Sequence, residues 1–262
     1  MSGNQVGLLL LLTAAAATPA TAQDDTWSWR KSIPAGKAIE IGTIIGDVVA
    51  KPTSGSEVRV IAKKSSRYSD ASDVRIEVVE HAGGVTICAM YPTSSRDREN
   101  ECLPGARGNS SSHDNDTEVD FEVEVPRGVK FTGRSVTGRV VATGLTADVK
   151  ANSVSGSVRV STTGLVQAST VSGSIDVVMG RTDWTDALRF STVSGNITIE
   201  MPGDLNTDVE VTTVSGSLSS DWPMSTTRRR FGPRNMQGRI GDGGRELVLS
   251  TVSGSIELKK SN

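Results

Sequence analysis

The hexapeptide TVSGSI at Thr170–Ile175 decides the fold, because the chain repeats it. Close copies lie at Ser153–Val158, Thr192–Ile197, Thr213–Leu218 and Thr251–Ile256, and weaker copies at Thr43–Val48, Ser135–Val140 and Asn235–Ile240. The glycines of these phrases are Gly46, Gly138, Gly156, Gly173, Gly195, Gly216, Gly238 and Gly254. After the first interval they recur every 16 to 22 residues, which is the spacing of a structural repeat.

The residues around each phrase alternate between apolar and polar, as in a β-strand. Val166 and Ala168, seven and five residues before Gly173, predict an inward face. The alternation slips by one residue inside the phrase. We therefore expect Val171 and Ile175 to face the same side again once the chain has bent. Each repeat is predicted to form a strand, a corner and a second strand.

One repeat has too little apolar surface to fold alone. It buries about six side chains at roughly 1.5 to 3 kcal/mol each, whereas ordering the backbone costs roughly 1 to 2 kcal/mol per residue. Stacked repeats cover one another and pair their backbones about 4.8 Å apart. We expect an all-β protein built as a β-solenoid of 16–22-residue rungs, with the eight glycines at corners where a side chain would clash or φ would be positive. The alternative is a β-sandwich of ordinary hairpins with Ser-Gly turns.

The first 22 residues are predicted to be a signal peptide. An apolar run from Val6 to Ala17 is followed by Ala20–Ala22, which has the A-x-A pattern of a cleavage site. No later stretch is long and apolar enough for a membrane span. We expect residues 23–262 to form a single β-solenoid domain that is exported to the periplasm, the cell surface or the extracellular space.

The two cysteines, Cys88 and Cys102, are 14 positions apart. In an oxidising compartment such a pair favours a disulfide over a reactive site, and two thiols alone do not complete a metal site. The disulfide is expected to tether the polar loop between Pro92 and Thr117.

The interval between Gly46 and Gly138 indicates an excursion from the repeats at about residues 51–128. Its apolar segments predict four strands, which we expect to form a sheet that caps or flanks the solenoid. These segments are Val58–Ala62, Val74–Val79, Val85–Tyr91 and Val119–Val125.

The repeated TVSGSI phrase, the export signal, and Val85–Pro92 followed by Asn100–Cys102 resemble the bacterial putative-adhesin family of exported β-helical domains of unknown function. The resemblance covers nearly all of the mature chain. It implies the β-helical fold and a provisional role in adhesion, and it supplies no binding or catalytic residues.

The charge balance and the histidines exclude several kinds of function. Lys and Arg number 28 against 30 Asp and Glu, a net charge of −2 that argues against a nucleic-acid partner. The only histidines, His81 and His113, lie outside the repeats, so the sequence predicts no Ser-His-Asp or Cys-His site. The third positions after the glycines form no acidic ladder of the kind that cleaves polysaccharides. They are Arg159, Asp176, Thr198, Ser219 and Glu257.

Two charged clusters allow a binding hypothesis and a plainer alternative. Asp114, Asp116, Glu118 and Asp120 alternate as calcium ligands would, but they lack the glycine and distal Glu of a calcium loop, and a solvated strand entry is the alternative. The second cluster contacts anionic polymers or is a solvated loop. It consists of Arg228, Arg229, Arg230 and Arg234. No metal or cofactor is predicted.

Two stacked hydroxyl rows are the best candidate for a functional surface. The rows either offer donors and acceptors to a ligand or satisfy backbone groups at the corners. They are Ser155, Ser172, Ser194, Ser215 and Ser253, and Ser157, Ser174, Asn196, Ser217 and Ser255. The sequence favours an exported, non-enzymatic envelope or surface protein that contacts envelope polysaccharide or another surface protein. The alternative is a carbohydrate-active enzyme on a β-helical scaffold.

Overall fold

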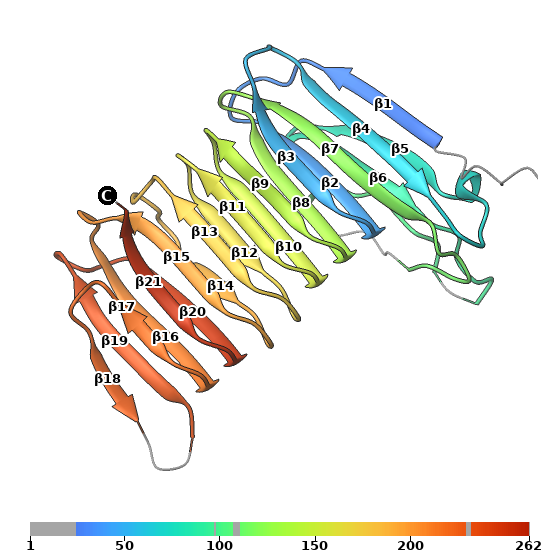
Figure 1. Ribbon diagram of the computed structural model, residues 1–262. Helices are drawn as coiled ribbons and strands as arrows, with labels where there is room; N and C mark the ends of the chain where they lie inside the picture. Colours follow the sequence, from blue (N-terminus) through green and yellow to red (C-terminus); the bar gives the residue numbers. More distant parts are fainter. Residues whose placement is uncertain (1–24, 97, 107–110, 229–231, 262) are drawn as a thin grey trace, which may run out of the picture.

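A computed structural model describes residues 25–96, 98–106, 111–228 and 232–261 as an all-β, solenoid-like molecule of two large sheets. The described residues contain no α-helix, only the short 3₁₀ turns η1 (Ala71–Asp73) and η2 (Pro104–Ala106). The predicted signal peptide lies outside the described residues. Figure 1 shows the strands stacked side by side along one axis of the molecule.

The first sheet, sheet A, has the strand order β1-β4-β7-β3-β9-β11-β13-β15-β21-β17. Its strands are β1 (Asp25–Lys31), β3 (Val48–Thr53), β4 (Val58–Ser65), β7 (Glu118–Pro126), β9 (Val140–Leu145), β11 (Val158–Thr162), β13 (Ile175–Met179), β15 (Ile197–Pro202), β17 (Leu218–Ser220) and β21 (Ile256–Ser261).

The second sheet, sheet B, has the order β18-β19-β16-β20-β14-β12-β10-β8-β2-β6-β5. Its strands are β2 (Ala38–Ile45), β5 (Arg75–His81), β6 (Gly84–Met90), β8 (Lys130–Thr137), β10 (Val149–Ser155), β12 (Val166–Ser169), β14 (Leu188–Ser191), β16 (Thr207–Ser215), β18 (Ser225–Arg228), β19 (Arg234–Ile240) and β20 (Glu246–Ser253).

Successive repeats pair in parallel and in register. Val158 pairs with Ile175, and Ile175 pairs with Ile197, so equivalent positions lie side by side along sheet A. Sheet B shows the same relation, because Ala168 pairs with Ala151 on one side and Phe190 on the other. This parallel pairing differs from the hairpins that a β-sandwich would require.

The core lies between the two sheets and is filled by the inward residues of most of the described strands. Burial alternates along β12 as the sequence predicts, with Val166 and Ala168 buried and Gln167 exposed. Phe121, Phe131 and Phe190 are the largest fully buried side chains.

The prediction that Val171 faces the core is wrong. Val171 is 47% exposed, and the neighbouring Thr170 is buried instead. The inside of the corner contains backbone carbonyl groups that need a donor, and the Thr170 hydroxyl bonds Gly156 O at 2.9 Å. A valine cannot make this bond, so the apolar side chain turns outward.

The excursion does not form a separate sheet, because its strands extend both existing sheets. β6 pairs in parallel with β2, and β7 pairs in parallel with β3, so together they form one more rung whose corner is replaced by the 92–117 loop. Antiparallel strands β4 and β1 complete sheet A at this end, and β5 completes sheet B. The predicted disulfide between Cys88 and Cys102 is present, with Cα atoms 5.7 Å apart.

The spatial order of the repeats differs from their chain order. β20 and β21 lie between the β14/β15 pair and the β16/β17 pair, which precede them in the chain (Figure 1). The prediction that Gly238 occupies a corner is wrong. Gly238 lies within β19, which pairs antiparallel with β16 and places it opposite Val209.

Candidate functional site

The other seven predicted corner glycines occupy one column along an edge of the molecule, which we call the corner edge. A Cβ added to Gly195 would lie 2.0 Å from Gly173 O, far inside van der Waals contact. Gly156 would meet Gly138 O at the same distance, although Gly156 has no positive φ. Lack of space between neighbouring repeats therefore requires glycine even where the backbone conformation does not.

A buried hydroxyl lies three residues before these corner glycines. Ser153 Oγ donates to Gly138 O at 2.8 Å, and Thr192 Oγ1 donates to Gly173 O at 3.0 Å. The same bond joins Thr213 to Gly254 and Thr251 to Gly195. Each of these hydroxyls thus satisfies a carbonyl of the adjacent repeat, which fixes the corner and turns the next residue outward.

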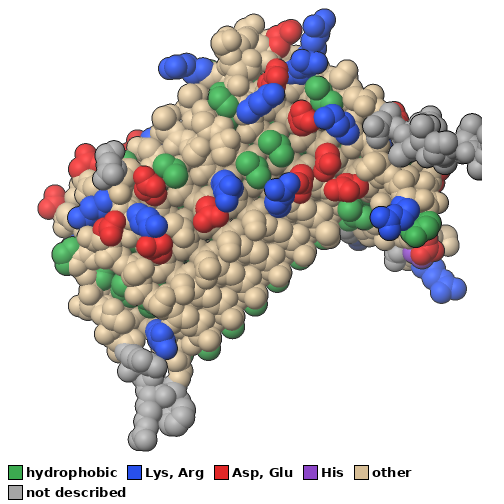
Figure 2. Space-filling model, in the orientation of Figure 1, with side chains coloured by type: hydrophobic (Ala, Val, Ile, Leu, Met, Phe, Trp, Pro, Cys, Tyr) green, Lys and Arg blue, Asp and Glu red, His purple; other side chains and the backbone are tan. Residues whose placement is uncertain are grey.

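That next residue is an exposed valine in six repeats. The six side chains, 36% to 53% exposed, form what we call the valine column. They are Val136, Val154, Val171, Val193, Val214 and Val252. Figure 2 shows the stacked repeats as a band with few charged side chains, and hydrophobic side chains recur along its lower rim.

The valine column borders a groove of about 870 Å³ along sheet B, which we call the valine groove. The groove is also lined by short polar side chains that lie four residues before the glycines. These are Asn152, Ser169, Ser191, Thr212 and Ser250. The groove therefore offers methyl groups beside hydroxyl and amide groups, in a pattern that repeats with the rungs.

One end of the groove is charged. Arg134 Nη1 lies 3.9 Å from Glu40 Oε2, which also accepts a bond from Gly105 N at 2.8 Å. Burial lowers the pKa of Arg134, and the nearby Glu40 carboxylate opposes this effect. Glu101 and Leu103, held next to the disulfide, line the same end. The loop that replaces a corner thus closes the groove.

The first predicted hydroxyl row is aligned and exposed. Ser172 bridges in parallel to Ser155 and Ser194, and Ser253 bridges to Ser194 and Ser215. These five serines lie beside the valine column, so the exposed surface of the corner edge combines hydroxyl groups with methyl groups.

The second row is largely engaged by the backbone. Asn196 Oδ1 accepts from Ser255 N at 2.9 Å, and Ser255 Oγ accepts from Ser217 N at 3.2 Å. Ser174 Oγ accepts from Asn196 N at 3.3 Å. These contacts support the structural interpretation of this row.

The remaining candidates are scattered. His81 contacts Thr86, and His113 lies on the surface beside Asp114, so the two histidines serve separate local contacts. The described residues contain no group of three His, Cys, Asp or Glu that could hold a metal ion. Arg234 donates to Gly216 O, whereas Arg229 and Arg230 lie outside the described residues.

The four alternating carboxylates are used in different ways. Asp116 accepts bonds from the backbone of Ser69, Tyr68 and Arg67, and hydrogen bonding to Ser69 is the main cause that lowers its pKa. Asp120 Oδ1 accepts from Asp47 N at 2.7 Å. Burial raises the pKa of Glu118, with Asp120 adding to the effect. Asp114 has a positive φ of 48° and contacts His113.

Sequence reasoning missed the valine groove, because it assigned Val171 to the core. The sequence feature that indicates the groove is the order of Ser or Thr directly before Val in every strong copy of the phrase. A hydroxyl at the tightest point of a turn indicates a backbone partner, and the following side chain must then point away from the core.

These features define a class of all-β, solenoid-like proteins with a glycine corner in each repeat. Residues 109–259 match the family described as Toastrack DUF4097, and the chain belongs to this family. A search of curated proteins finds no match.

Two solved structures are similar over most of the chain. One is described as a putative cell adhesion protein from Clostridium sporogenes ATCC 15579; it is 10% identical, with 90% of this chain and 100% of that chain covered and a TM-score of 0.43. The other is described as a putative adhesin from Bacteroides fragilis NCTC 9343; it is 13% identical, with 89% and 97% covered and a TM-score of 0.36. In the described part of this chain, no helix has the length and apolarity needed to cross a bilayer.

Proposed function

We propose that this chain is an exported, non-enzymatic β-solenoid of the cell envelope or surface that binds an extended, neutral polysaccharide along the valine groove. The exposed valine column carries this proposal. Aligned apolar side chains on a surface mark interaction sites, and here they repeat in register beside hydroxyl groups. The sequence-based export signal and the resemblance to surface adhesins support the location.

The chemistry of the groove favours a neutral polymer. Sugar rings present C–H faces and hydroxyl groups, which match valine methyls beside Ser, Thr and Asn side chains. An anionic polymer would need a row of cations, and Arg134 is the only Lys or Arg among the groove residues. Each repeat adds a small contact, so affinity depends on the number of repeats that the polymer spans.

The groove does not provide an evident hydrolytic site. Glycoside hydrolysis uses two carboxylates across the scissile bond. Glu40 and Glu101 are the acids that line the groove, and Glu40 already accepts from Gly105 N and faces Arg134. A carbohydrate-active enzyme therefore remains an outcome of the test.

The test is a binding screen of the mature chain against neutral and anionic envelope polysaccharides by affinity electrophoresis. The triple variant Val171→Ser, Val193→Ser, Val252→Ser removes three adjacent members of the valine column. The matched control is Val178→Ser, because Val178 is 42% exposed on β13 of sheet A, outside the groove. We expect neutral polymers to bind, the triple variant to bind at least tenfold more weakly, and the control to match the wild type.

Two results would overturn the proposal. Absence of binding to every neutral polymer, or equal binding by the triple variant, removes the groove as the contact surface. Release of soluble oligosaccharide by the wild-type chain supports the enzyme instead.

A further inference from the structure

The Gly254 repeat, which consists of β20 and β21, lies between two repeats that precede it in the chain. The chain runs from β15 of sheet A to β16 of sheet B through residues 203–206, yet β16 is not the neighbour of β14 in sheet B, and β17 is not the neighbour of β15 in sheet A. A slot one repeat wide is therefore left between the Gly195 and Gly216 repeats, and the Gly254 repeat fills it.

Both walls of the slot bind the Gly254 repeat in the same way. Gly195 N donates to Ser253 O at 2.9 Å on one side, and Gly254 N donates to Ser215 O at 2.8 Å on the other. Inside the slot, Leu249 pairs with both Phe190 and Val211. The walls recognise the backbone and inward face that every strong copy of the repeat has.

The inserted repeat is essential to the core. Its inward residues are all fully buried. These are Leu247, Leu249, Ile256 and Leu258. An empty slot would expose them together with the side chains of both walls, so the slot has to be filled by this repeat or by one that is equivalent to it.

A glycine-rich hinge leads into the inserted repeat. Gly241, Gly243 and Gly244 all have positive φ, and they connect β19 to β20. The hinge is held to the start of β16 by Asn206 Oδ1, which accepts from Asp242 N at 2.8 Å, and by Asp208. Rotations at these glycines would swing the repeat out. β14 and β16 would keep their pairing with β12 and β19, whereas β17, which among the described strands has β21 as its one neighbour in sheet A, would regain a partner when a second Gly254 repeat enters the slot.

We propose that the slot is an interaction site for a second copy of this chain, whose Gly254 repeat replaces the resident one, so that two chains exchange these repeats and form a dimer. Every contact within the slot is then made again between chains, and only the hinge changes conformation. Exchange requires the repeat to leave its slot, so it takes place when concentrated chains fold or refold together.

The test compares refolding of three full-length chains from urea at high protein concentration without reductant. The wild type has a removable Gly254 repeat. In the variant Ser191→Cys, Ser250→Cys, an engineered disulfide, which we call the slot staple, joins β14 of the slot wall to β20 of the inserted repeat. The two serines pair in register on these strands. The control Ser169→Cys, Ser191→Cys places the same staple between β12 and β14, which are not exchanged.

Staple closure is verified before unfolding by counting free thiols, and dimer is measured by size exclusion with light scattering. We expect the wild type and the control to form dimer, and the slot staple to give at least tenfold less. Reducing the slot staple before refolding should restore dimer to the level of the equally reduced control.

The proposal is overturned if none of the chains dimerises, since the slot then accepts only its own repeat. It is also overturned if the slot staple dimerises as much as the control, because association then uses another surface. The measurement is independent of polysaccharide binding.

Discussion

The two long edges of the molecule solve the same problem, a return of the chain between sheets, in different ways. At the corner edge the turns that contain the repeated phrase have the same number of residues, and hydroxyl groups bonded to glycine carbonyls hold them. The opposite edge, which we call the return edge, consists of turns that vary in length and use charged side chains. Four of these turns are residues 146–148, 163–165, 180–187 and 203–206.

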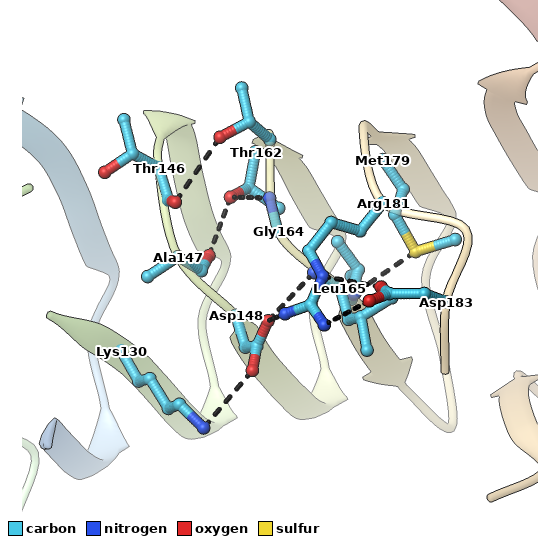
Figure 3. A network of polar contacts seen from close by, with 12 residues as sticks. Lys130, Thr146, Ala147, Asp148, Thr162, Gly164, Leu165, Met179, Arg181 and Asp183 are labelled. Carbon is cyan, nitrogen blue, oxygen red and sulfur yellow. Dashed lines mark hydrogen bonds and ion pairs between the residues drawn. The ribbon is translucent and has the colours of Figure 1, made fainter. Parts of the chain in front are cut away.

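Asp148 is the centre of the return edge in Figure 3. Its Oδ1 accepts from Leu165 N at 3.1 Å and lies 3.2 Å from Arg181 Nη1, while its Oδ2 lies 3.3 Å from Lys130 Nζ. Arg181 also donates to Asp183 within its own turn. One carboxylate therefore links the turns of successive repeats.

The difference explains why the phrase repeats so closely while the interval between repeats does not. Backbones approach most closely at the corner edge, where no other residue replaces glycine. The return edge leaves room for insertions, so it absorbs the variation from 17 to 22 residues between successive corner glycines from Gly138 to Gly216.

The largest effect is expected from Gly195→Ala. The new Cβ would lie 2.0 Å from Gly173 O, so two repeats must separate, and we expect a loss of about 4 kcal/mol or more in the free energy of unfolding. Urea denaturation followed by circular dichroism measures it. The control is Gly203→Ala at the return edge, where the added Cβ meets only Lys260 Cδ at 3.8 Å. Similar unfolding midpoints for the two variants would contradict the role of the corner.

A smaller loss is expected from Asp148→Ala at the return edge. The substitution removes a backbone acceptor and two ion-pair contacts from a side chain that is 29% exposed, so we expect about 2 kcal/mol. The loss should shrink in 1 M salt, whereas that of Gly195→Ala should not. A salt-independent loss would show that charge is not what joins these turns.

The buried hydroxyl of a single corner should contribute less again. Thr192→Val keeps the shape but leaves Gly173 O without this donor, and we expect a loss of about 1 kcal/mol. Thr198→Val, an outward position on β15, is the matched control and should be nearly neutral. Equal unfolding midpoints for the two variants would count against the hydroxyl column.

Acid should destabilise the return edge and leave the corner edge nearly unchanged, so the two edges can be distinguished without a mutation. Hydrogen bonding to Arg181 lowers the pKa of Asp183, and hydrogen bonding to Arg239 lowers that of Asp208. Stability from such carboxylates is present above their unfolded pKa near 4 and is lost as pH falls through the lower folded pKa. Amide exchange, corrected for intrinsic rates, should therefore rise at residues 180–187 and 239–245 between pH 6 and pH 3, and stay nearly constant at the corners. A uniform rise would contradict this assignment.

The repeats and most strands could be predicted from the sequence because alternation and glycine spacing reflect local geometry. The sequence predicts the strands of the excursion to within a few residues of their ends, and it also predicts the disulfide between Cys88 and Cys102. It does not predict the attachment of those strands, because the 92–117 loop replaces the phrase that marks a corner. There Tyr91 Oη, 2.9 Å from Ile45 O and 3.0 Å from Thr117 O, takes the place of the small corner hydroxyl.

The spatial order of the repeats and the valine groove could not be predicted from the sequence. Copies with the same phrase stack equally well on one another, so nothing local indicates that the Gly254 repeat precedes the Gly216 repeat in space. The valine groove depended on which side of the corner Val171 occupies, and a hydrogen bond from Thr170 decides that. Gly238 shows the converse error, since a glycine at the expected interval lies in an antiparallel strand.

The glycine column also makes the molecule extensible. Because each corner touches only the units directly before and after it, duplication of a gene segment that encodes one unit would lengthen the molecule by about 4.8 Å and leave every existing junction unchanged. Reach and avidity can therefore evolve through copy number alone, with no change in the chemistry of any single unit.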